Sequence, residues 1–420
     1  MGPRSSSCDV VVVGAGAAGV GAGRHLVAAG LDVIVLEARD RLGGRAHSVA
    51  TALGIPVDIG CEWLHSAERN PWTGIARDLG FEIDETLPDW GQRVSWHFGK
   101  AAQRDWMAAR EAFDERCARA AKERDDRPES ALLEAGGRWN GLLRAISTWA
   151  NGTELERVSV KDHDRYDNSM YNFRVPRGYG TLISAYGAEL PVRFGCIVER
   201  IDHSGRAITV STNQGEITTQ AVIVTLPTNL LAAESIRFTP ALPDKIAAAS
   251  GLPLGIADKL FLAVDGAVDD LPRDRHLIGK TDRAETGGYQ LRPHGWPAIG
   301  AYFGGQFAAG LEREGPAGMA GFAIDELVGL FGAGIRARLT PLASSAWVLD
   351  PLATGSYSCA LPGHADDREI LAAPIDERLF FAGEACSIAF FGTAHGAFIT
   401  AVAAAERIVA AQRTTAPSSR

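Results

Sequence analysis

The N-terminal segment contains two apolar runs separated by glycines. Residues 9–13 are almost entirely β-branched and residues 32–37 form a second apolar run, and such runs are typical of fully buried strands. Between them, Gly14-Ala15-Gly16-Ala17-Ala18-Gly19 precedes a segment that predicts a helix ending near Ala29, before Gly30. We therefore expect a complete βαβ unit at the start of the chain.

Residues 88–150 show a different pattern, with apolar side chains at helical spacing among many charges. The apolar positions are Trp106, Met107, Phe113, Leu132, Leu133, Trp139, Leu142 and Ile146. We interpret this region as a helical insertion, in which the highly charged residues 122–129 form a solvated loop.

From Val192 onward, short strands are predicted at residues 197–201, 207–212, 216–219 and 221–226. Further strands are expected near 259–264 and 298–303, with a helix near 317–331. The last segment predicts a strand at 379–382, a glycine-containing turn and an apolar helix at 393–412. We expect residues 413–420 to be a disordered tail.

Composition narrows the class of protein. The 420 residues exceed what one hydrophobic core usually holds, so two domains are expected. The net charge of -9 is spread along the chain, which argues against a nucleic-acid partner. Six cysteines without a CxxC pair indicate no metal site, and no segment is predicted to span a membrane. Without a secretory signal, we expect reduced thiols and a cytoplasmic location.

The glycine segment has the spacing of a dinucleotide site. Gly14 permits a tight turn, Gly16 lets the backbone approach a pyrophosphate, and Gly19 lets helix and strand pack closely. The free N–H groups of the first helical turn, from Ala17 and Ala18 on, face the phosphates. Glu37 ends the second strand, where a carboxylate accepts hydrogen bonds from ribose and disfavours the 2′-phosphate of NADP.

A second pair of glycines follows directly. Gly43-Gly44-Arg45 suits another backbone approach to a diphosphate, and with Glu37 and Arg41 it completes an ExxxRxGGR pattern. At this point the chain resembles the flavin-containing amine oxidase family, which includes monoamine oxidases, polyamine oxidases and flavin-dependent histone lysine demethylases. The resemblance implies that FAD is the cofactor and that this stretch, with Ala38 and Arg39, contacts it.

The resemblance covers nearly the whole chain. The segment Gly60-Cys61-Glu62-Trp63-Leu64-His65 is similar to the family's G-x-x-W-[IVL]-[HE] segment, which passes the flavin. Val198 resembles a valine whose backbone meets the adenine, and Glu384, after Gly383, resembles an acid that holds the ribityl chain. Gly392, Thr393 and Ala394 resemble the start of a final helix, whose positive end stabilises negative charge on reduced flavin.

The implied fold is α/β: a Rossmann-like, glutathione-reductase-like FAD domain with two dinucleotide-binding motifs and an inserted α+β substrate domain. Residues 1–80, 178–250 and 348–412 are expected to form the FAD domain, because its two motifs lie at opposite ends of the chain. Residues 81–177 and 251–347 are expected to form the substrate domain.

Three residues are expected at the reaction centre. A lysine in an apolar strand ordinarily lies at a strand edge, but the resemblance implies that Lys259 bonds through a water to flavin N5. Tyr357 is the preferred member of an aromatic cage, with Trp63, Phe390, Phe391 and Trp347 as other candidates. The sequence supports two roles for His65 equally, one in the substrate site and one in the structure. Thr393 replaces the second cage tyrosine of monoamine oxidases, which favours the polyamine-oxidase side.

The flavin is expected to bind without a covalent bond. Animal monoamine oxidases attach FAD through a cysteine that precedes a tyrosine, whereas Ser356 precedes Tyr357 here and Cys359 is displaced by three residues. The predicted cofactor is therefore non-covalent FAD.

The leading interpretation is an oxidase that transfers hydride from a small-molecule primary or secondary amine to flavin. The imine then hydrolyses, and O₂ is reduced to H₂O₂. An L-amino-acid oxidase would need an arginine for the substrate carboxylate, for which Arg174 and Arg177 are weak candidates. The same fold also accommodates a desaturase or porphyrinogen-type oxidase, and a non-catalytic FAD-binding scaffold is a further hypothesis. The sequence does not determine the substrate, the electron acceptor or the oligomeric state, with a homodimer as one expectation.

Overall fold

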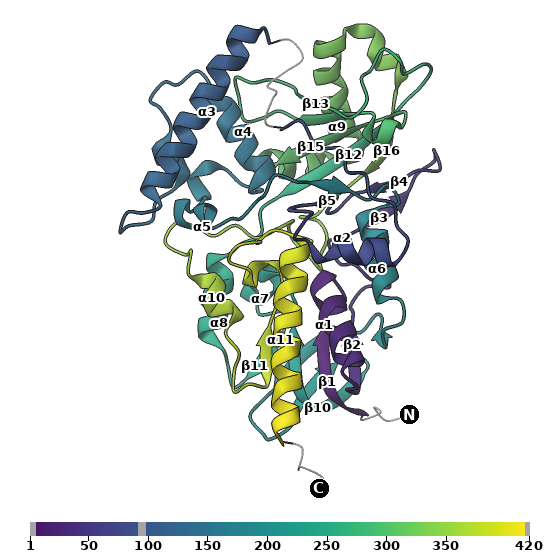
Figure 1. Ribbon diagram of the computed structural model, residues 1–420, viewed down its shortest axis with the longest axis vertical. Helices are drawn as coiled ribbons and strands as arrows, with labels where there is room; N and C mark the ends of the chain where they lie inside the picture. The colour runs from purple at the N-terminus through teal and green to yellow at the C-terminus, as the bar shows by residue number, and fades with distance from the viewer. Residues whose placement is uncertain (1–5, 91–97, 416–420) are drawn as a thin grey trace.

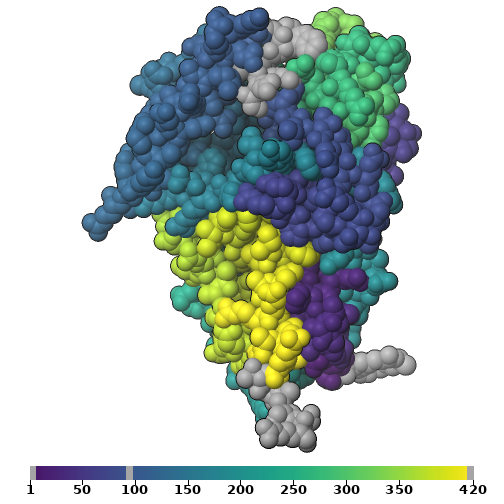
Figure 2. Space-filling model, in the orientation of Figure 1, coloured from purple at the N-terminus to yellow at the C-terminus, as the bar shows by residue number. Residues whose placement is uncertain are grey.

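The computed structural model describes residues 6–90 and 98–415, which contain an eight-stranded and a five-stranded β-sheet. Figure 1 shows the larger sheet in the lower half, where the first and last described helices, Ala17–Ala28 and Ala394–Thr415, lie side by side. Figure 2 shows the same arrangement on the surface, with the purple and yellow ends of the chain beneath the blue and green segments. Residues 416–420 of the predicted tail lie outside the described residues.

The larger sheet has the order β11-β8-β9-β10-β1-β2-β7, and β17 also pairs with β10. Its strands are β1 (Ser6–Val13), β2 (Val33–Leu36), β7 (Val192–Arg193), β8 (Val198–Asp202), β9 (Ile208–Thr212), β10 (Gly215–Val224), β11 (Arg237–Thr239) and β17 (Leu379–Phe381). β1 runs parallel to β2 and β10, and β17 runs parallel to β10. The carboxyl ends of these four strands therefore meet at one edge of the sheet.

The prediction of two strands between 216 and 226 is wrong, because β10 is continuous. The break was placed at Gln220, which is exposed while Thr219 and Ala221 are buried. A polar residue on the solvated face of an alternating strand does not interrupt it.

Alternation along β1 divides its side chains between two cores. Val10 and Val12 pack in the cluster beneath the helices of one face, and Val11 and Val13 pack in the cluster of the other. The helices around this sheet are α1 (Ala17–Ala28), α2 (Pro71–Asp78), α6 (Tyr179–Gly187), α7 (Thr228–Ala232), α8 (Pro243–Gly251), α10 (Asp367–Ala372) and α11 (Ala394–Thr415). The predicted βαβ unit, β1–α1–β2, is confirmed.

The smaller sheet has the order β13-β14-β15-β12-β16 and packs against a long helix, α9. These elements are β12 (Ala257–Val264), β13 (Arg275–Ile278), β14 (Gly288–Leu291), β15 (Ala298–Gly304), α9 (Gly305–Phe331) and β16 (Leu339–Ser344). α9 breaks at Gly315 (φ 77°), before Pro316, so the helix predicted at 317–331 is its second part. β12 lies between β15 and β16, which places Lys259 in the middle of the sheet instead of at a strand edge.

The expected helical insertion is confirmed by α3 (Lys100–Ala120) and α4 (Asn140–Ala150), which precede α5 (Val160–Asp164). Trp106, Phe113 and Trp139 form its core, but Met107 is 44% exposed. Glu129, expected in a solvated loop, is buried, because its carboxylate pairs with the ring of His163.

The remaining short elements connect the two halves. They are β3 (Ser48–Ala50), β4 (Pro56–Asp58), β5 (Trp63–Leu64), β6 (Phe173–Arg174) and the 3₁₀ turns Glu129–Leu132, Leu155–Arg157, Pro293–Gly295, Ala333–Arg338 and Glu384–Cys386. Strands from segments 1–80, 178–250 and 348–412 make the larger sheet, and strands from 251–347 make the smaller one. The division into FAD and substrate domains stays a prediction.

The last helix corrects two expectations. Arg413 belongs to α11, so the helix extends into the predicted tail. Residues Ala394–Arg413 are also long and apolar enough to cross a membrane by length and composition, with a mean hydropathy of 1.2, contrary to the prediction from sequence. Ala401 and Ala405 are fully buried, and Phe398 packs against Gly21 of α1. This close packing accounts for the apolar composition of α11 as a core helix.

Candidate functional site

The glycine turn lies where β1 ends and α1 begins. A Cβ at Gly19 would lie 1.8 Å from the Gly14 carbonyl oxygen, so the close packing requires glycine. A Cβ at Gly16 would approach no protein atom nearer than 3.8 Å, so the missing side chain leaves room for a ligand. No side chain caps α1, which leaves the N–H groups of Ala17 and Ala18 available at its positive end. These features fit a bound diphosphate.

Glu37 lies at the same edge, and the protein fixes its carboxylate. One oxygen accepts the N–H of Ala15 at 2.7 Å, and the other accepts the N–H of Arg39 at 2.9 Å. The Cys196 N–H donates to the Glu37 carbonyl, which brings the start of β8, at Val198, beside this strand end. The structure thus gathers Glu37, Ala38, Arg39 and Val198 close to the glycine turn.

The second glycine pair packs directly on the first. The Gly43 N–H donates to the Ala15 carbonyl at 2.9 Å, and Gly43 forms an isolated bridge with Gly16. Gly43 and Gly44 have φ of 94° and 58°, which glycine adopts without strain. A Cβ at Gly60 would lie 1.9 Å from the Arg45 carbonyl oxygen, so the segment that leads to Glu62 lies against the same turn.

Glu384 connects this turn to the C-terminal part of the chain. Its carboxylate accepts Arg45 Nη1 at 2.8 Å, Ser358 Oγ at 2.6 Å and the Gly392 N–H at 2.9 Å. Burial raises the pKa of Glu384, but the Arg45 charge and the Ser358 hydrogen bond outweigh it and hold the pKa below its ordinary value. Glu384 is therefore ionised at neutral pH and balances the charge of Arg45.

A hollow opens at the carboxyl ends of β10 and β17, where ligands bind in open α/β sheets. It is lined by Arg45, Val224, Leu226, Pro227, Thr228, Leu231, Leu371, Phe381, Ala382, Gly383, Glu384, Ala385 and Cys386. A Cβ at Gly383 would meet nothing within 4 Å, so there is open space beside its backbone. Arg45 and Glu384 thus border this hollow, which lies next to the turn that carries Gly43 and Gly44.

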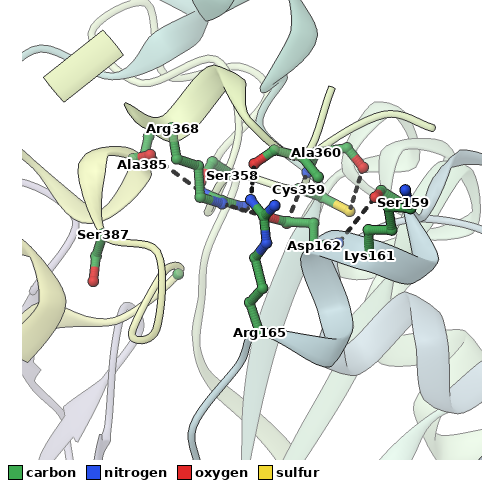
Figure 3. A network of polar contacts seen from close by, with 12 residues as sticks. Ser159, Lys161, Asp162, Arg165, Ser358, Cys359, Ala360, Arg368, Ala385 and Ser387 are labelled. Carbon is green, nitrogen blue, oxygen red and sulfur yellow. Dashed lines mark hydrogen bonds and ion pairs between the residues drawn. The ribbon is translucent and has the colours of Figure 1, made fainter. Parts of the chain in front are cut away.

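A buried polar network, which the sequence did not indicate, supports Glu384 from behind. Arg368 is fully buried and forms a two-pronged ion pair with Asp162, at 2.6 and 2.8 Å. Arg368 also donates to Ser358 Oγ at 2.9 Å and to the Ala385 carbonyl at 3.2 Å (Figure 3). The Ser358 hydroxyl accepts a hydrogen bond from Arg368 and donates its own proton to the Glu384 carboxylate. α5 is thereby linked to the hollow.

The N-terminus of α11 approaches the same region. The Thr393 hydroxyl donates to the Phe390 carbonyl and accepts the Gly396 N–H at 2.9 Å, so Thr393 caps the helix. His395 is buried in the first turn against Phe390, and burial lowers its pKa to about 3. The uncharged first turn leaves the positive end of the helix dipole, at Ala394, uncompensated.

Lys259 and Glu62 form an ion pair on the other side of the Arg45 turn. Lys259 Nζ lies 2.8 Å from Glu62 Oε2 and 3.2 Å from the Asp58 carbonyl oxygen. The Lys259 and Glu62 side chains are 10% and 13% exposed. Sequence reasoning named both residues but did not pair them.

Tyr357 has an aromatic partner that sequence reasoning missed. The Tyr357 hydroxyl donates to the Trp149 carbonyl and therefore accepts from the Tyr302 hydroxyl, at 3.2 Å. Lys259 Nζ lies 5.9 Å from the centre of the Tyr302 ring. Tyr302 reaches this place because β15 pairs with β12 in a register that opposes Tyr302 to Lys259.

The other aromatic candidates are engaged elsewhere. Trp63 packs between Trp90, at 4.7 Å, and the Arg174 guanidinium, at 5.0 Å. Phe391 lies 4.0 Å from the Arg368 guanidinium, and Trp347 donates to the Ile59 carbonyl. Their membership of an aromatic cage stays a prediction.

The tautomer of His65 can be inferred from its neighbour. Asn172 Nδ2 donates to the Met170 carbonyl, so Asn172 Oδ1 accepts from His65 Nδ1 at 2.8 Å. Burial, with the nearby Lys259 charge, lowers the pKa of His65 although the Asn172 bond opposes it. The neutral ring keeps Nε2 as its hydrogen-bond acceptor.

The thiols nearest the hollow are unreactive. Burial raises the pKa of both Cys359 and Cys386 to about 12, so neither is a thiolate at neutral pH. Ser356, which precedes Tyr357, donates its hydroxyl to the Ala257 carbonyl at 2.9 Å. No group of three or more metal-ligand side chains gathers within residues 6–90 and 98–415.

Comparison with known proteins identifies relatives along almost the whole chain. The family model for flavin-containing amine oxidoreductases matches residues 17–409. Polyamine oxidase 4 of Oryza sativa subsp. japonica is 30% identical, over 96% of this chain and 88% of the relative. Lysine-specific histone demethylase 1 homolog 2 of the same plant is 27% identical, over 97% of this chain but only 58% of the relative.

A solved structure shares the fold. Wild-type putrescine oxidase bound to putrescine matches with a TM-score of 0.78 at 17% sequence identity, over 97% of this chain and 100% of that one. This likeness confirms the expected fold class, an FAD-binding amine oxidase fold.

Proposed function

The chain belongs to the flavin-containing amine oxidoreductase family, and from this premise we propose that it oxidises the C–N bond of a small polyamine or monoamine with O₂ as electron acceptor. It is an FAD-dependent amine oxidoreductase. Bound FAD supplies the acceptor for a hydride that leaves the carbon next to nitrogen. Its diphosphate would be held by the turns around Gly16 and Gly43, and its ribose by Glu37.

The observation that carries this proposal is the grouping of Lys259, Glu62, Tyr302 and Tyr357 beside the Arg45 turn. The two tyrosines offer aromatic surface to an uncharged amine, and their hydroxyls are occupied by each other and by a backbone carbonyl. Lys259 brings a proton donor beside these rings, where we propose that it orients a water and assists reoxidation by O₂.

We propose that His65 contacts the substrate amine. As a neutral ring with Nε2 as acceptor, it suits an amine N–H or a proton released from a substrate ammonium. Asn172 holds the ring in that tautomer. Of the two roles open to His65 from the sequence, this proposal takes the substrate-site role.

The chain is similar to polyamine oxidases over nearly its full length, which favours polyamines as substrates. An L-amino-acid oxidase is less well supported. Arg174, a candidate for binding a substrate carboxylate, already pairs with Asp84 and Asp274, each at 2.8 Å. Arg177 lies 4.3 Å from the Phe81 ring.

The proposed setting is the cytoplasm, without nucleic-acid or membrane partners. All six cysteines fall within the described residues and are free thiols, which fits a reducing compartment. The proposed flavin attachment is non-covalent, supported by Ser356 and by the unreactive Cys359.

The test is H₂O₂ production from putrescine, spermidine, phenethylamine, lysine and an apolar desaturase substrate. We expect turnover of putrescine or spermidine, with a smaller rate for phenethylamine. The matched control is the Lys259→Met variant, which keeps most of the stem volume. Turnover of lysine alone would establish an amino-acid oxidase, and flavin reduction only by the desaturase substrate would overturn amine oxidation.

A further inference from the structure

Lys259 and Glu62 come from different parts of the chain and meet in a buried position. Lys259 is in the middle of β12, and Glu62 immediately precedes β5. Their 2.8 Å contact is a charge-assisted hydrogen bond, and the second acceptor of Lys259 Nζ is a backbone carbonyl, at Asp58. Glu62 is therefore the carboxylate bonded directly to this amine.

The pair determines the charge of both members. Burial lowers the pKa of Lys259, but Glu62, with Tyr302 and Asp58, outweighs burial and raises the pKa above its ordinary value. Burial raises the pKa of Glu62, but Lys259 and Arg174 outweigh it and lower the pKa. Without its partner, each side chain would be driven toward its neutral form.

The charged groups around the pair do not replace this contact. The Asp58 carboxylate is bonded to the backbone N–H groups of Tyr179 and Gly180 and to Ser48. Arg174 is balanced by two aspartates, and His294 pairs with one of them, Asp84. The rings of His65 and Tyr302 and the Cys61 thiol also lie near the pair. All three are uncharged at neutral pH, and burial raises the pKa of Cys61 to about 12.

We propose that Glu62 is a positioning residue that acts through Lys259, holding its side chain as an oriented ammonium beside Tyr302 across the working pH range. The inference rests on the proposed role of Lys259 in the reaction. An ammonium has three donors and no acceptor, whereas a neutral amine has a lone pair and can turn to donate or accept. Loss of Glu62 therefore changes both the charge and the orientation that Lys259 presents.

The first test measures thermal stability of the FAD-loaded protein between pH 6 and pH 9. In the wild type, both pKa values of the pair lie outside this window, so the pair adds no slope. The pKa of Asp58, about 6, and that of Asp258, about 8, lie inside it, so each variant is compared with the wild-type profile. In Glu62→Gln, the folded-state pKa of Lys259 falls below that of the unfolded chain. The unfolded chain then binds more protons, so stability falls as pH falls, by up to about tenfold in the unfolding constant per pH unit. Glu62→Gln/Lys259→Met should lack this slope.

The second test follows flavin reduction by amine and reoxidation by O₂ separately, in stopped flow. Reoxidation in Glu62→Gln should gain an ionisation between pH 6 and 9 that the wild type and the double variant lack. The matched control is Glu326→Gln, which removes a buried carboxylate bonded to Tyr289 and Thr286, away from Lys259. It should destabilise the protein without adding the ionisation.

The results distinguish failure of the inference about Glu62 from failure of the proposed role of Lys259 in turnover. If Glu62→Gln shows neither the stability slope nor the new ionisation, Glu62 does not control the charge of Lys259, and the inference is overturned. If both half-reactions stay within a few-fold of wild type in Lys259→Met, the lysine has no role in turnover, and the proposed function loses its best residue. Should Glu62→Gln fail to fold, normal accumulation of the double variant supports the pair, and its failure contradicts it.

Discussion

Replacing Asp162 by asparagine removes the charge that balances Arg368 while keeping the shape of the side chain. Arg368 is fully buried, and no solvent reaches its guanidinium to compensate for the lost carboxylate. Removing one partner of a buried ion pair lowers the free energy of unfolding by about 3–5 kcal/mol, because the remaining charge is uncompensated. We therefore expect Asp162→Asn to be among the most destabilising single changes in the protein.

The expected change in melting temperature follows from the size of the chain. With about 2.1 cal/mol/K of unfolding entropy per residue, 420 residues give roughly 0.9 kcal/mol/K. A loss of about 3–5 kcal/mol then lowers the melting temperature by roughly 3–6 °C, which calorimetry resolves.

The matched control is Asp114→Asn, which breaks the Arg110–Asp114 pair on α3, where the side chains are 40% and 54% exposed. Such a pair contributes about 0.3–0.5 kcal/mol, so the shift should stay below about 1 °C. The double variant Asp162→Leu/Arg368→Met should recover most of the stability, since no buried charge remains. A shift for Asp162→Asn no larger than that of Asp114→Asn would refute the reasoning.

Three further outcomes are expected. Glu37→Gln turns an NH₂ group toward the N–H of Ala15 or Arg39, which costs about 1.5–3 kcal/mol of FAD binding. The FAD dissociation constant, measured with apoprotein, should therefore rise roughly 10- to 150-fold. An unchanged dissociation constant would contradict the role of Glu37. Acid precipitation should release the FAD into solution, and flavin in the pellet would demonstrate a covalent bond. Burial and the neighbouring Glu312 raise the pKa of Asp258 to about 8. The folded protein holds this side chain neutral below that pH, and the free energy of unfolding falls as the pH rises toward it. The melting temperature of Asp258→Asn minus that of the wild type should therefore increase between pH 6 and pH 9. A difference that stays constant across this range would show that Asp258 does not titrate there.

The parts of the site that the sequence predicted depend on short-range signals. Gly14, Gly16 and Gly19 lie between two β-branched runs, and the local spacing of strand, turn and helix is enough to place Glu37 beside Ala15, 22 residues away. The right-handed crossover of a βαβ unit then determines on which face of the two strands the helix packs. For this reason the first turn could be described before any tertiary contact was known.

The parts that could not be predicted depend on pairings between distant segments. Glu62 and Lys259 are 197 residues apart, and Asp162 and Arg368 are 206 apart. Tyr302 opposes Lys259 only because β12 and β15 pair in one register, and a shift of one residue would turn Tyr302 to the other face. No hydrophobic pattern in one sequence determines such a register.

The pairing of β17 with β10, and of β10 with β1, has a consequence for biosynthesis. A ribosome adds about 5–20 residues per second, so β17 emerges roughly 20–70 s after β1 has left the exit tunnel. During that interval the hollow at the carboxyl ends of β10 and β17 lacks the wall formed by residues 381–386. FAD can therefore be captured with full affinity only after translation is nearly complete, and the protein should depend on chaperones to shield the apolar edge of β10 until its last strand arrives.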